Sequence, residues 1–408
     1  MPLLAQSVAE LAALPDVRAC LEWLRRERAW VNERHLALCR IPAPTFFEEK
    51  RAEWMKAQLQ ALGWEARIDK GGNVIATLPG YKDVPYVAVT AHLDTVLAPR
   101  NESEIRLGED GRYLGPGVAD NGAGLAGLLA LAAAWRACPP LDTPECAPVL
   151  VANVGEEGEG NLSGMRYFCR SADLSRVKAF LVLDGPGAEH ITSRALASRR
   201  FEVVISGPGG HSWRDHNTGN PVHASSRAVT LFTDDAAHAS QAAGADLPRT
   251  TINFGIIDGG SSINSIPSEA RGKIDLRSES GPHIDRMVEQ LTAAVEEAVE
   301  IENLRAPGGR VSSRLREIGS RPAGDLATDA PILEAFRAVD EHLGIRSRLD
   351  CSSTDANVPL SLGLQAVSVG AGGQGGGAHT MAEWYSPEGR DAGLRRVLLA
   401  LCVLLSAE

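Results

Sequence analysis

Long helical stretches open the chain and give way to short apolar runs. Val8–Trp30 and Glu48–Leu62 are rich in Ala, Leu, Arg and Glu, which is typical of helices, and Gly63 favours the end of the second. The run Val87–Ala91 is short, apolar and rich in strand-forming residues. It suits a strand buried on both faces, although periodicity alone leaves a buried helical segment open.

Strands and helices alternate after this run. In order we expect helix Ala123–Ala137, strand Val149–Val154, helix Leu162–Arg170 and strand Phe180–Leu183. Helices of this length between strands predict an α/β fold, with a mostly parallel sheet flanked by helices on both faces. Two apolar runs, Leu125–Trp135 and Leu398–Ala407, are shorter than the roughly 18 residues of a membrane span, so we expect buried helices there.

The pattern changes near Arg199. Three strands and two helices are expected next, at Arg199–Ser206, Pro221–Thr233, Thr250–Ile257, Glu269–Leu276 and Ile284–Ile301. An α+β unit of this order can bury a core of its own, which predicts a second domain inserted into the first. The α/β pattern then resumes with helix Ala330–Leu343, strand Ala366–Val369 and helix Pro387–Leu405. We therefore expect a first domain of residues 1–198 and 313–408 and an inserted domain of residues 199–312.

Charge and cysteine content limit the kinds of binding partner and the cellular compartment that we expect for this protein. Lysine and arginine total 41 and aspartate and glutamate 52, so the net charge is -11 and gives no general attraction to nucleic acid or an anionic membrane. The seven cysteines are scattered and never spaced as Cys-x-x-Cys, which indicates reduced thiols in the cytoplasm. We also expect no secretory signal, because the first residues lack a basic start followed by an apolar stretch.

Side chains that bind metals lie in the loops beside the predicted strands of the first domain. Five loops carry a histidine or a carboxylate, and together they hold His92, Asp94, Asp120, Glu156, Glu157, Asp184 and His379. Singly, such residues fit turns, helix caps or solvated pairs. Because ligands collect beyond the carboxyl ends of parallel strands, we expect them to share one site. Two imidazoles and several carboxylates suit zinc or a related divalent ion, and a carboxylate can bridge two ions about 3.5–4 Å apart.

In this order and spacing, the motifs resemble the M20 family of di-zinc peptidases, which contains tripeptidases, carboxypeptidases and aminoacylases. The inserted domain resembles the same family through Gly209-Gly-His211-Ser, Asn264-Ser-Ile-Pro267 and Asp275-Leu-Arg277. The resemblance implies two divalent ions, zinc first, with Co²⁺ or Mn²⁺ as alternatives. It also implies a di-zinc catalytic domain joined to an inserted dimerisation (lid) domain.

The resemblance assigns a ligand set to the two ions. His92 and Asp184 would bind one ion. Glu157 and His379 would bind the other, and Asp120 would bridge both.

The remaining polar residues of the first domain receive supporting roles. Of two adjacent glutamates, one can ligate a metal while the other faces bound water, and the resemblance makes Glu156 the general base on the bridging water. Asp94 would orient His92 through its other ring nitrogen. The Asp120–Asn121 peptide bond would be cis, as the resemblance implies.

In the inserted domain, the family pattern selects His211 over neighbouring His216, between which the residues alone do not choose. The resemblance implies a homodimer through this domain, in which His211 enters the partner's site and stabilises the oxyanion of the intermediate. Arg277, with Asn264, would hold a substrate carboxylate. Asp355 has two alternatives, a structural role or a place behind the metal ligands.

The sequence thus predicts a cytoplasmic, homodimeric two-metal exopeptidase for small peptides, leaning toward di- or tripeptide aminopeptidase activity. A carboxypeptidase or an N-acyl-amino-acid deacylase on the same scaffold is the alternative. A non-catalytic binding protein is expected to lose the base or a ligand, and this chain keeps all of them. A nucleotide-binding enzyme is disfavoured, because the glycines at 115, 117, 122 and 124 do not form Gly-x-Gly-x-x-Gly directly after a strand.

Overall fold

The computed structural model describes residues 2–81, 83–141, 145–243 and 248–407. The chain divides into two compact units: unit 1 comprises Met1–Ala195 and Gly324–Glu408, and unit 2 comprises Leu196–Ala323. The first boundary lies close to the predicted residue 199. The second lies at Ala323 instead of residue 312, because a strand at Ser312–Arg321 pairs inside unit 2.

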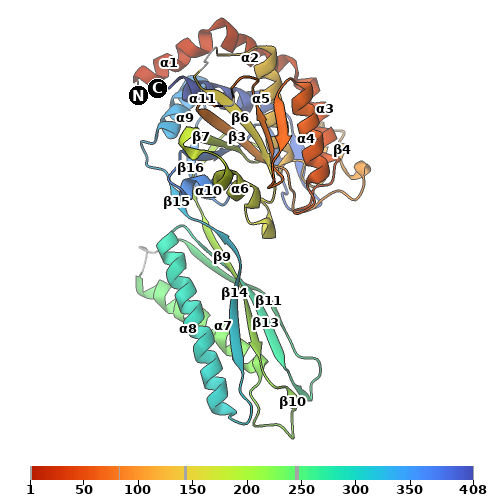
Figure 1. Ribbon diagram of the computed structural model, residues 1–408, viewed down its shortest axis with the longest axis vertical. Coiled ribbons are helices and arrows are strands. Elements are labelled where there is room, and N and C mark those ends of the chain that lie inside the picture. The colour runs from red at the N-terminus through yellow and green to blue at the C-terminus, as the bar shows by residue number, and fades with distance from the viewer. Residues whose placement is uncertain (1, 82, 142–144, 244–247, 408) are drawn as a thin grey trace. The chain divides into compact units, whose positions relative to one another are not determined.

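A nine-stranded mixed sheet forms the centre of unit 1 (Figure 1). Its order is β1-β2-β6-β3-β7-β17-β8-β15, and β16 pairs with β8. The neighbouring strands β6, β3, β7 and β17 run parallel, which confirms the predicted α/β fold class. The bounds are β1 (Glu65–Ile68), β2 (Val74–Thr77), β3 (Tyr86–His92), β6 (Ala147–Asn153), β7 (Val177–Leu183), β8 (His190–Ala195), β15 (Gly324–Asp325), β16 (Arg348–Ser352) and β17 (Ala366–Val369).

Helices cover both faces of this sheet. Strand β3 is buried throughout, and its side chains alternate between two cores, as the two-residue period of a strand requires. One core contains residues of α5 and α11, and the other contains residues of α6. The helices of unit 1 are α1 (Pro2–Ala13), α2 (Pro15–Arg26), α3 (Arg28–Cys39), α4 (Glu49–Ala61), α5 (Gly122–Ala137), α6 (Ser163–Ser171), α9 (Pro331–Leu343), α10 (Asn357–Ser361) and α11 (Arg390–Ser406).

The two apolar runs that suggested buried helices form α5 and α11. Every residue of α5 from Gly122 to Trp135 is buried. Within the described part of the chain, none of the helices combines the length and the hydropathy that a membrane crossing needs. A small second sheet of order β18-β19-β5-β4 completes unit 1, with bounds β4 (Arg106–Leu107), β5 (Tyr113–Leu114), β18 (Gln374–Gly376) and β19 (Trp384–Ser386).

Unit 2 is an antiparallel four-stranded sheet of order β11-β13-β9-β14 with two long helices packed together on one face (Figure 1). A short pair, β10 with β12, lies outside this sheet. The bounds are β9 (Ala197–Ser206), β10 (Gly210–His211), α7 (Pro221–Ala243), β11 (Thr250–Gly259), β12 (Ser265–Ile266), β13 (Glu269–Ser278), α8 (Gly281–Arg305) and β14 (Ser312–Arg321).

Strand β14 was not expected from the sequence, and its place at the sheet edge explains why. It contains only Leu315 and Ile318 as large apolar residues and is mostly exposed along its first half. An edge strand with one solvated face needs little apolar surface, so its pattern resembles that of a loop. Pairing with β9, with one register shift between Glu317 and Gly319, nevertheless joins it to the sheet, and Leu315 packs against the unit 2 core.

Candidate metal centre

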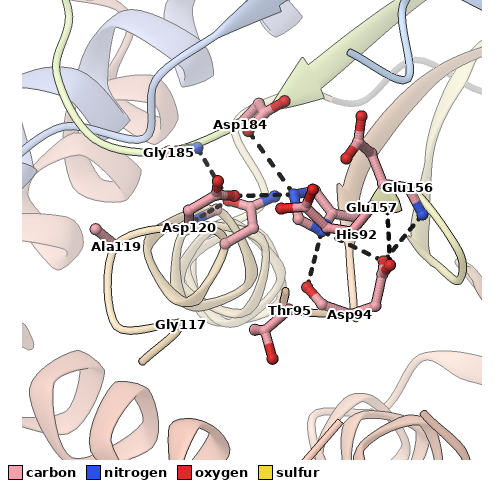
Figure 2. A network of polar contacts seen from close by, with 12 residues as sticks. His92, Asp94, Thr95, Gly117, Ala119, Asp120, Glu156, Glu157, Asp184 and Gly185 are labelled. Atoms are coloured by element: carbon pink, nitrogen blue, oxygen red, sulfur yellow. Dashed lines mark hydrogen bonds and ion pairs between the residues drawn. The ribbon is translucent and has the colours of Figure 1, made fainter. Parts of the chain in front are cut away.

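The predicted ligands of unit 1 converge at the carboxyl ends of adjacent parallel strands (Figure 2). His92 is the last residue of β3, and Asp184 directly follows β7. Glu156 and Glu157 follow β6, which pairs with β3 on its other side. Because the central strands are parallel, their carboxyl ends lie at one edge of the sheet, where ligand sites form in this class of fold.

Two groups of three side chains have the spacing of metal ligands. One group joins His92, Asp120 and Asp184. The other joins Asp120, Glu157 and His379. Within each group the ligand atoms lie within 4.8 Å of one another, and Asp120 belongs to both. The structure thus brings together the five residues of the predicted ligand set; their binding of ions remains a prediction.

Asp120 lies between the two imidazoles. Its Oδ1 is 3.1 Å from Nε2 of His92, and its Oδ2 is 3.1 Å from Nε2 of His379. The same His379 nitrogen is 3.0 Å from Oε1 of Glu157, while Oδ1 of Asp184 is 3.8 Å from Nε2 of His92. Separate carboxylate oxygens facing separate imidazoles are what a carboxylate bridging two ions requires.

Asn121 attaches the Asp120 loop to the end of β7. Its side-chain amide donates to the carbonyl of Leu183 over 2.8 Å, and its Oδ1 accepts from the amides of Gly124 and Gly185, each at 3.0 Å. The Asp120–Asn121 peptide bond is cis, as predicted. These contacts tie the start of α5 to the strand that presents Asp184.

Asp94 lies behind His92 and is completely buried. Nδ1 of His92 is 3.0 Å from the carbonyl oxygen of Asp94 and 3.4 Å from its Oδ1, so Nε2 is left to face the other ligands. The Asp94 carboxylate also accepts from the backbone amides of Glu156 at 3.0 Å and Glu157 at 2.9 Å. Asp94 therefore contacts the imidazole through its carbonyl and its carboxylate, and the carboxylate also holds the loop of the two glutamates, a contact that sequence reasoning did not identify. Its role in orienting His92 remains a prediction.

The electrostatics of the cluster favour a cation. Burial opposes protonation of His92, yet hydrogen bonds with Asp120 and two further aspartates raise its pKa well above the ordinary value. The hydrogen bond with Asp120 likewise raises the pKa of His379 to about 9, and burial raises the pKa of the Glu157 carboxyl to about 6. Imidazoles that hold protons so strongly face concentrated negative charge, which divalent ions can neutralise in place of the protons. The donor set therefore fits the implied metals.

Glu156 and Glu157 are both buried, with exposed fractions of 5% and 6%. Their carboxylates and a nitrogen of His92 form a third group whose atoms lie within 4.8 Å of one another. Figure 2 shows the two side chains leaving the same loop beside His92. A carboxylate this near the ligands can reach a water molecule held between them, which is the position a general base needs. The role of Glu156 as base remains a prediction.

Glu383 supports the Asp120 loop and was not selected from the sequence. Its carboxylate, 2% exposed, accepts from the amides of Gly117 at 2.8 Å, Ala119 at 2.7 Å and Asp120 at 2.8 Å. Burial raises the pKa of this carboxyl against the three donors, which lower it. Glu383 stands four residues after His379, so it couples the two loops that face Glu157. Its proximity to His379 was the only available signal in the sequence.

We expect the substitution Glu383→Gln to weaken metal binding. The new amide group must face at least one of the three backbone donors, which displaces Asp120, and losses of about 10–100-fold in metal affinity are typical when support behind a ligand is removed. Chelator competition with Zn²⁺ measures the effect. Glu388→Gln, at an exposed position in the same segment, is the matched control. Equal affinity in both variants would refute this role.

Asp355 lies in the interior behind the cluster. It is completely buried, and its Oδ2 accepts from the side-chain amide of Asn153, the last residue of β6, over 2.6 Å. Burial raises the pKa of its carboxyl to about 7, with a further increase from the charges of Asp94 and Asp184. Asp355 contacts the end of β6 and lies near Asp94 and Asp184, which favours the second predicted alternative, a position behind the metal ligands.

In unit 2, the His211 and Asn264 segments lie side by side. His211 pairs with Ser265 between β10 and β12, and the amide of Ser212 donates to the carbonyl of Asn264 over 3.0 Å. Nδ1 of His211 accepts from the amide of Trp213 at 3.1 Å. The oxyanion role and the choice against His216 remain predictions.

Within one copy of unit 2, Arg277 lies away from the His211 and Asn264 segments. Asn264 directly precedes β12, a few residues before β13 begins at Glu269. Arg277 lies eight residues beyond Glu269 along β13, a separation of roughly 26 Å at the rise of a strand. The Arg277 guanidinium donates instead to Oδ2 of Asp275 over 2.7 Å. One substrate carboxylate can therefore meet Asn264 and Arg277 only if they come from two copies of unit 2. The substrate role of both residues remains a prediction.

Family models match both parts of the chain. Residues 195–302 match the M20 model described as the peptidase dimerisation domain, and residues 73–242 match the model of peptidase family M28. The uncharacterized protein YqjE of Bacillus subtilis is 24% identical over 352 residues, 83% of this chain and 89% of that protein. Acetylornithine deacetylase of Myxococcus xanthus is 27% identical over 340 residues, 78% of this chain and 83% of that protein.

Solved structures share the fold. The aminopeptidase PepT of Bacillus cereus superposes with a TM-score of 0.70 at 22% identity, covering 93% of this chain and 99% of its own. A tripeptidase of Staphylococcus aureus gives 0.72 at 18% identity with the same coverage. A dinuclear metal binding peptidase of the M20 family from Bacillus subtilis gives 0.65 at 16% identity, covering 94% of this chain and 100% of its own.

The M28 match covers the loops of His92, Asp120, Glu157 and Asp184, ends inside α7 and does not reach His379. The M20 match spans most of unit 2, from before β9 to the last turn of α8. Unit 1 adds a metal-ligand cluster assembled from the motifs that first suggested this family. Together, the match of unit 2 and the cluster in unit 1 support an M20 family metallopeptidase.

Proposed function

We propose that this enzyme is a two-zinc exopeptidase that removes the amino-terminal residue of di- or tripeptides, acting as a cytoplasmic homodimer. The observation that carries the proposal is Asp120, whose two oxygens each lie 3.1 Å from a different imidazole. The fold shared with an aminopeptidase and a tripeptidase supports the substrate class. Seven free cysteines support a reducing compartment.

The residues of the chain divide the work of amide hydrolysis. Bound zinc would supply Lewis acidity, polarising the scissile carbonyl and lowering the pKa of water. Glu156 takes a proton from the attacking water and later returns it to the leaving amine. Asp94 keeps His92 oriented throughout, because it contacts the ring nitrogen that does not face the ligands. His211 of the partner subunit steadies the negative oxygen that develops.

A substrate panel tests the proposal. The panel contains Leu-Gly-Gly, its N-acetyl and C-terminal amide derivatives, and N-acetyl-leucine, and the preparation is first shown to hold two ions per chain. An aminopeptidase needs the free amine, so acetylation should abolish cleavage while the amide is tolerated. The reverse pattern identifies a carboxypeptidase, and release of acetate identifies a deacylase, the alternative that the match to acetylornithine deacetylase supports. No cleavage of any compound by the two-metal protein would refute the proposal.

The proposed dimer has a suitable surface in unit 2. Strand β11 forms an edge of the sheet, and Ile256 and Ile257 on it are 53% and 60% exposed. Edge strands with exposed apolar side chains readily pair with another copy, and homodimers with twofold symmetry use the same patch on both subunits. The match to a dimerisation domain includes this strand.

Mixed dimers test whether His211 acts on the partner's site. His211→Ala and Glu156→Gln subunits should each be nearly inactive alone. After subunit exchange, half of the dimers are mixed and each has one complete site, so activity should recover to roughly a quarter of the wild-type value. Native mass spectrometry confirms the mixed dimer. If a confirmed mixed dimer stays inactive, His211 does not act across the interface.

A further inference from the structure

Two adjacent phenylalanines are exposed in the loop between α3 and α4. The side chains of Phe46 and Phe47 are 58% and 68% exposed. Large apolar side chains gain nothing from contact with water, and grouped exposure of this kind marks surfaces that bind a partner or a ligand. Neither residue belongs to the ligand set or to the supporting network described above.

The residues on either side of this pair fasten the loop to the metal centre. Oγ1 of Thr45 donates to Oδ2 of Asp94 over 3.0 Å. The amide of Gly155 donates to Oε1 of buried Glu48 over 3.1 Å. Pro44 also forms an isolated parallel bridge with Thr95. The phenylalanines are therefore held between two anchors, one on each of the loops that follow β3 and β6.

These anchors place the pair close to the groups that would carry out the reaction. The Asp94 carboxylate accepts a hydrogen bond from the Thr45 hydroxyl, and it also accepts hydrogen bonds from the backbone amides of Glu156 and Glu157. Phe46 is the next residue after Thr45, so their Cα atoms are about 3.8 Å apart. Phe46 therefore directly follows a residue that contacts Asp94, the side chain that also holds the loop of the two glutamates.

The backbone of the pair is unusual for aromatic residues. Phe46 has φ +76°, in the left-handed region, and the turn is closed by the amide of Phe47, which donates to the carbonyl of Pro44 over 2.8 Å. Glycine adopts this conformation without steric cost, whereas a bulky residue does so rarely and mostly at functional sites. The loop thus carries an aromatic ring where its backbone geometry favours glycine.

We propose that Phe46 and Phe47 form an apolar subsite that receives a large apolar side chain of the peptide substrate beside the scissile bond. The inference rests on the proposed peptide hydrolysis and adds a substrate preference to it. Rigid aromatic rings provide a large contact area at a low cost in conformational entropy. Their exposure in the free protein leaves that area available to substrate.

Paired tripeptides test the subsite. Each position of Gly-Gly-Gly is replaced in turn by Ala or Leu, and kcat/KM is measured for the wild type and for Phe46→Ala/Phe47→Ala. At one position the wild type should prefer Leu over Ala by about tenfold, which is typical of an apolar pocket that gains a larger side chain. The double variant should reduce this preference to about twofold or less and leave the rate on the Ala peptide nearly unchanged.

Two further variants separate substrate contact from a structural effect. Phe46→Leu/Phe47→Leu keeps apolar surface and should keep most of the preference. Leu14→Ala, at a 46% exposed position between α1 and α2, is the control for loss of an exposed apolar side chain and should behave as the wild type.

The outcomes keep the two proposals apart. An active enzyme with no preference at any position overturns the subsite alone. A preference that survives in the double Ala variant also overturns it, as does an equal loss of rate on Ala and Leu peptides. Failure of the wild type to cleave any peptide overturns the proposed function, and the subsite with it.

Discussion

A Glu156→Gln enzyme should retain two metal ions and hydrolyse peptides about 10³-fold more slowly than the wild type. The amide cannot accept the proton of the attacking water, and removal of a general acid–base group typically costs 10²–10⁴-fold in rate. Glu156 is buried and its loop is held by Asp94, so the substitution changes charge with little change of shape. Steady-state kinetics and metal analysis on the same preparation measure both parts.

The neighbouring glutamate provides the contrast. Glu157→Gln should lose metal as well as activity, because Oε1 of Glu157 lies 3.0 Å from the His379 nitrogen in the second ligand group. Exposed Glu159 provides the control, and Glu159→Gln should leave both properties unchanged. A Glu156→Gln protein that binds two ions and works at the normal rate would exclude Glu156 as the base.

An Asp120→Ala protein should lose both metal ions, and its activity should fall at least about 10³-fold. Asp120 belongs to both ligand groups, so its removal leaves each group two ligands. Metal ions supply several kcal/mol of transition-state stabilisation in sites of this type, and 1.4 kcal/mol corresponds to a factor of about ten in rate. Elemental analysis after dialysis gives the number of ions per chain.

Asp184→Ala should have a smaller effect on metal content. Asp184 belongs only to the group of His92, so the ion of the Glu157 and His379 group should remain bound. Asp110, whose side chain is 58% exposed in unit 1, provides the control for loss of an aspartate. If Asp120→Ala and Asp184→Ala each lose a single ion, Asp120 does not bridge, and the ligand assignment must change.

Strong apolar patterns made most of the architecture of unit 1 predictable. Val87–Ala91 lies in strand β3, the predicted strand Val149–Val154 lies in β6 up to Asn153, and Leu125–Trp135 lies in α5. These segments are buried, and burial on all sides leaves a continuous apolar run in the sequence. Because parallel strands end at a common edge, the loops that carry the ligands could be grouped before any distance was known.

Segments with weaker patterns were missed. Strands β8 and β14 were not expected, because both are rich in polar residues: β8 contains Ile191 as its single large apolar residue, and the first half of β14 is mostly exposed. Glu383 and Thr45 were not selected either, although both hold loops of the metal centre. A glutamate or threonine that binds a distant backbone amide or carboxylate has no local signature, since its partner lies elsewhere in the sequence.

The sequence by itself determined the family resemblance, the strongly apolar elements and the loops that carry histidine and carboxylate, because these depend on local patterns and spacing. Only the tertiary structure decided that Asp120 faces both imidazoles and that Glu383 supports it from 263 residues away. It also decided that Arg277 and Asn264 lie toward opposite ends of β13. Such relations depend on strand register and on where loops close, and a single change of register reverses the direction of every side chain on a strand.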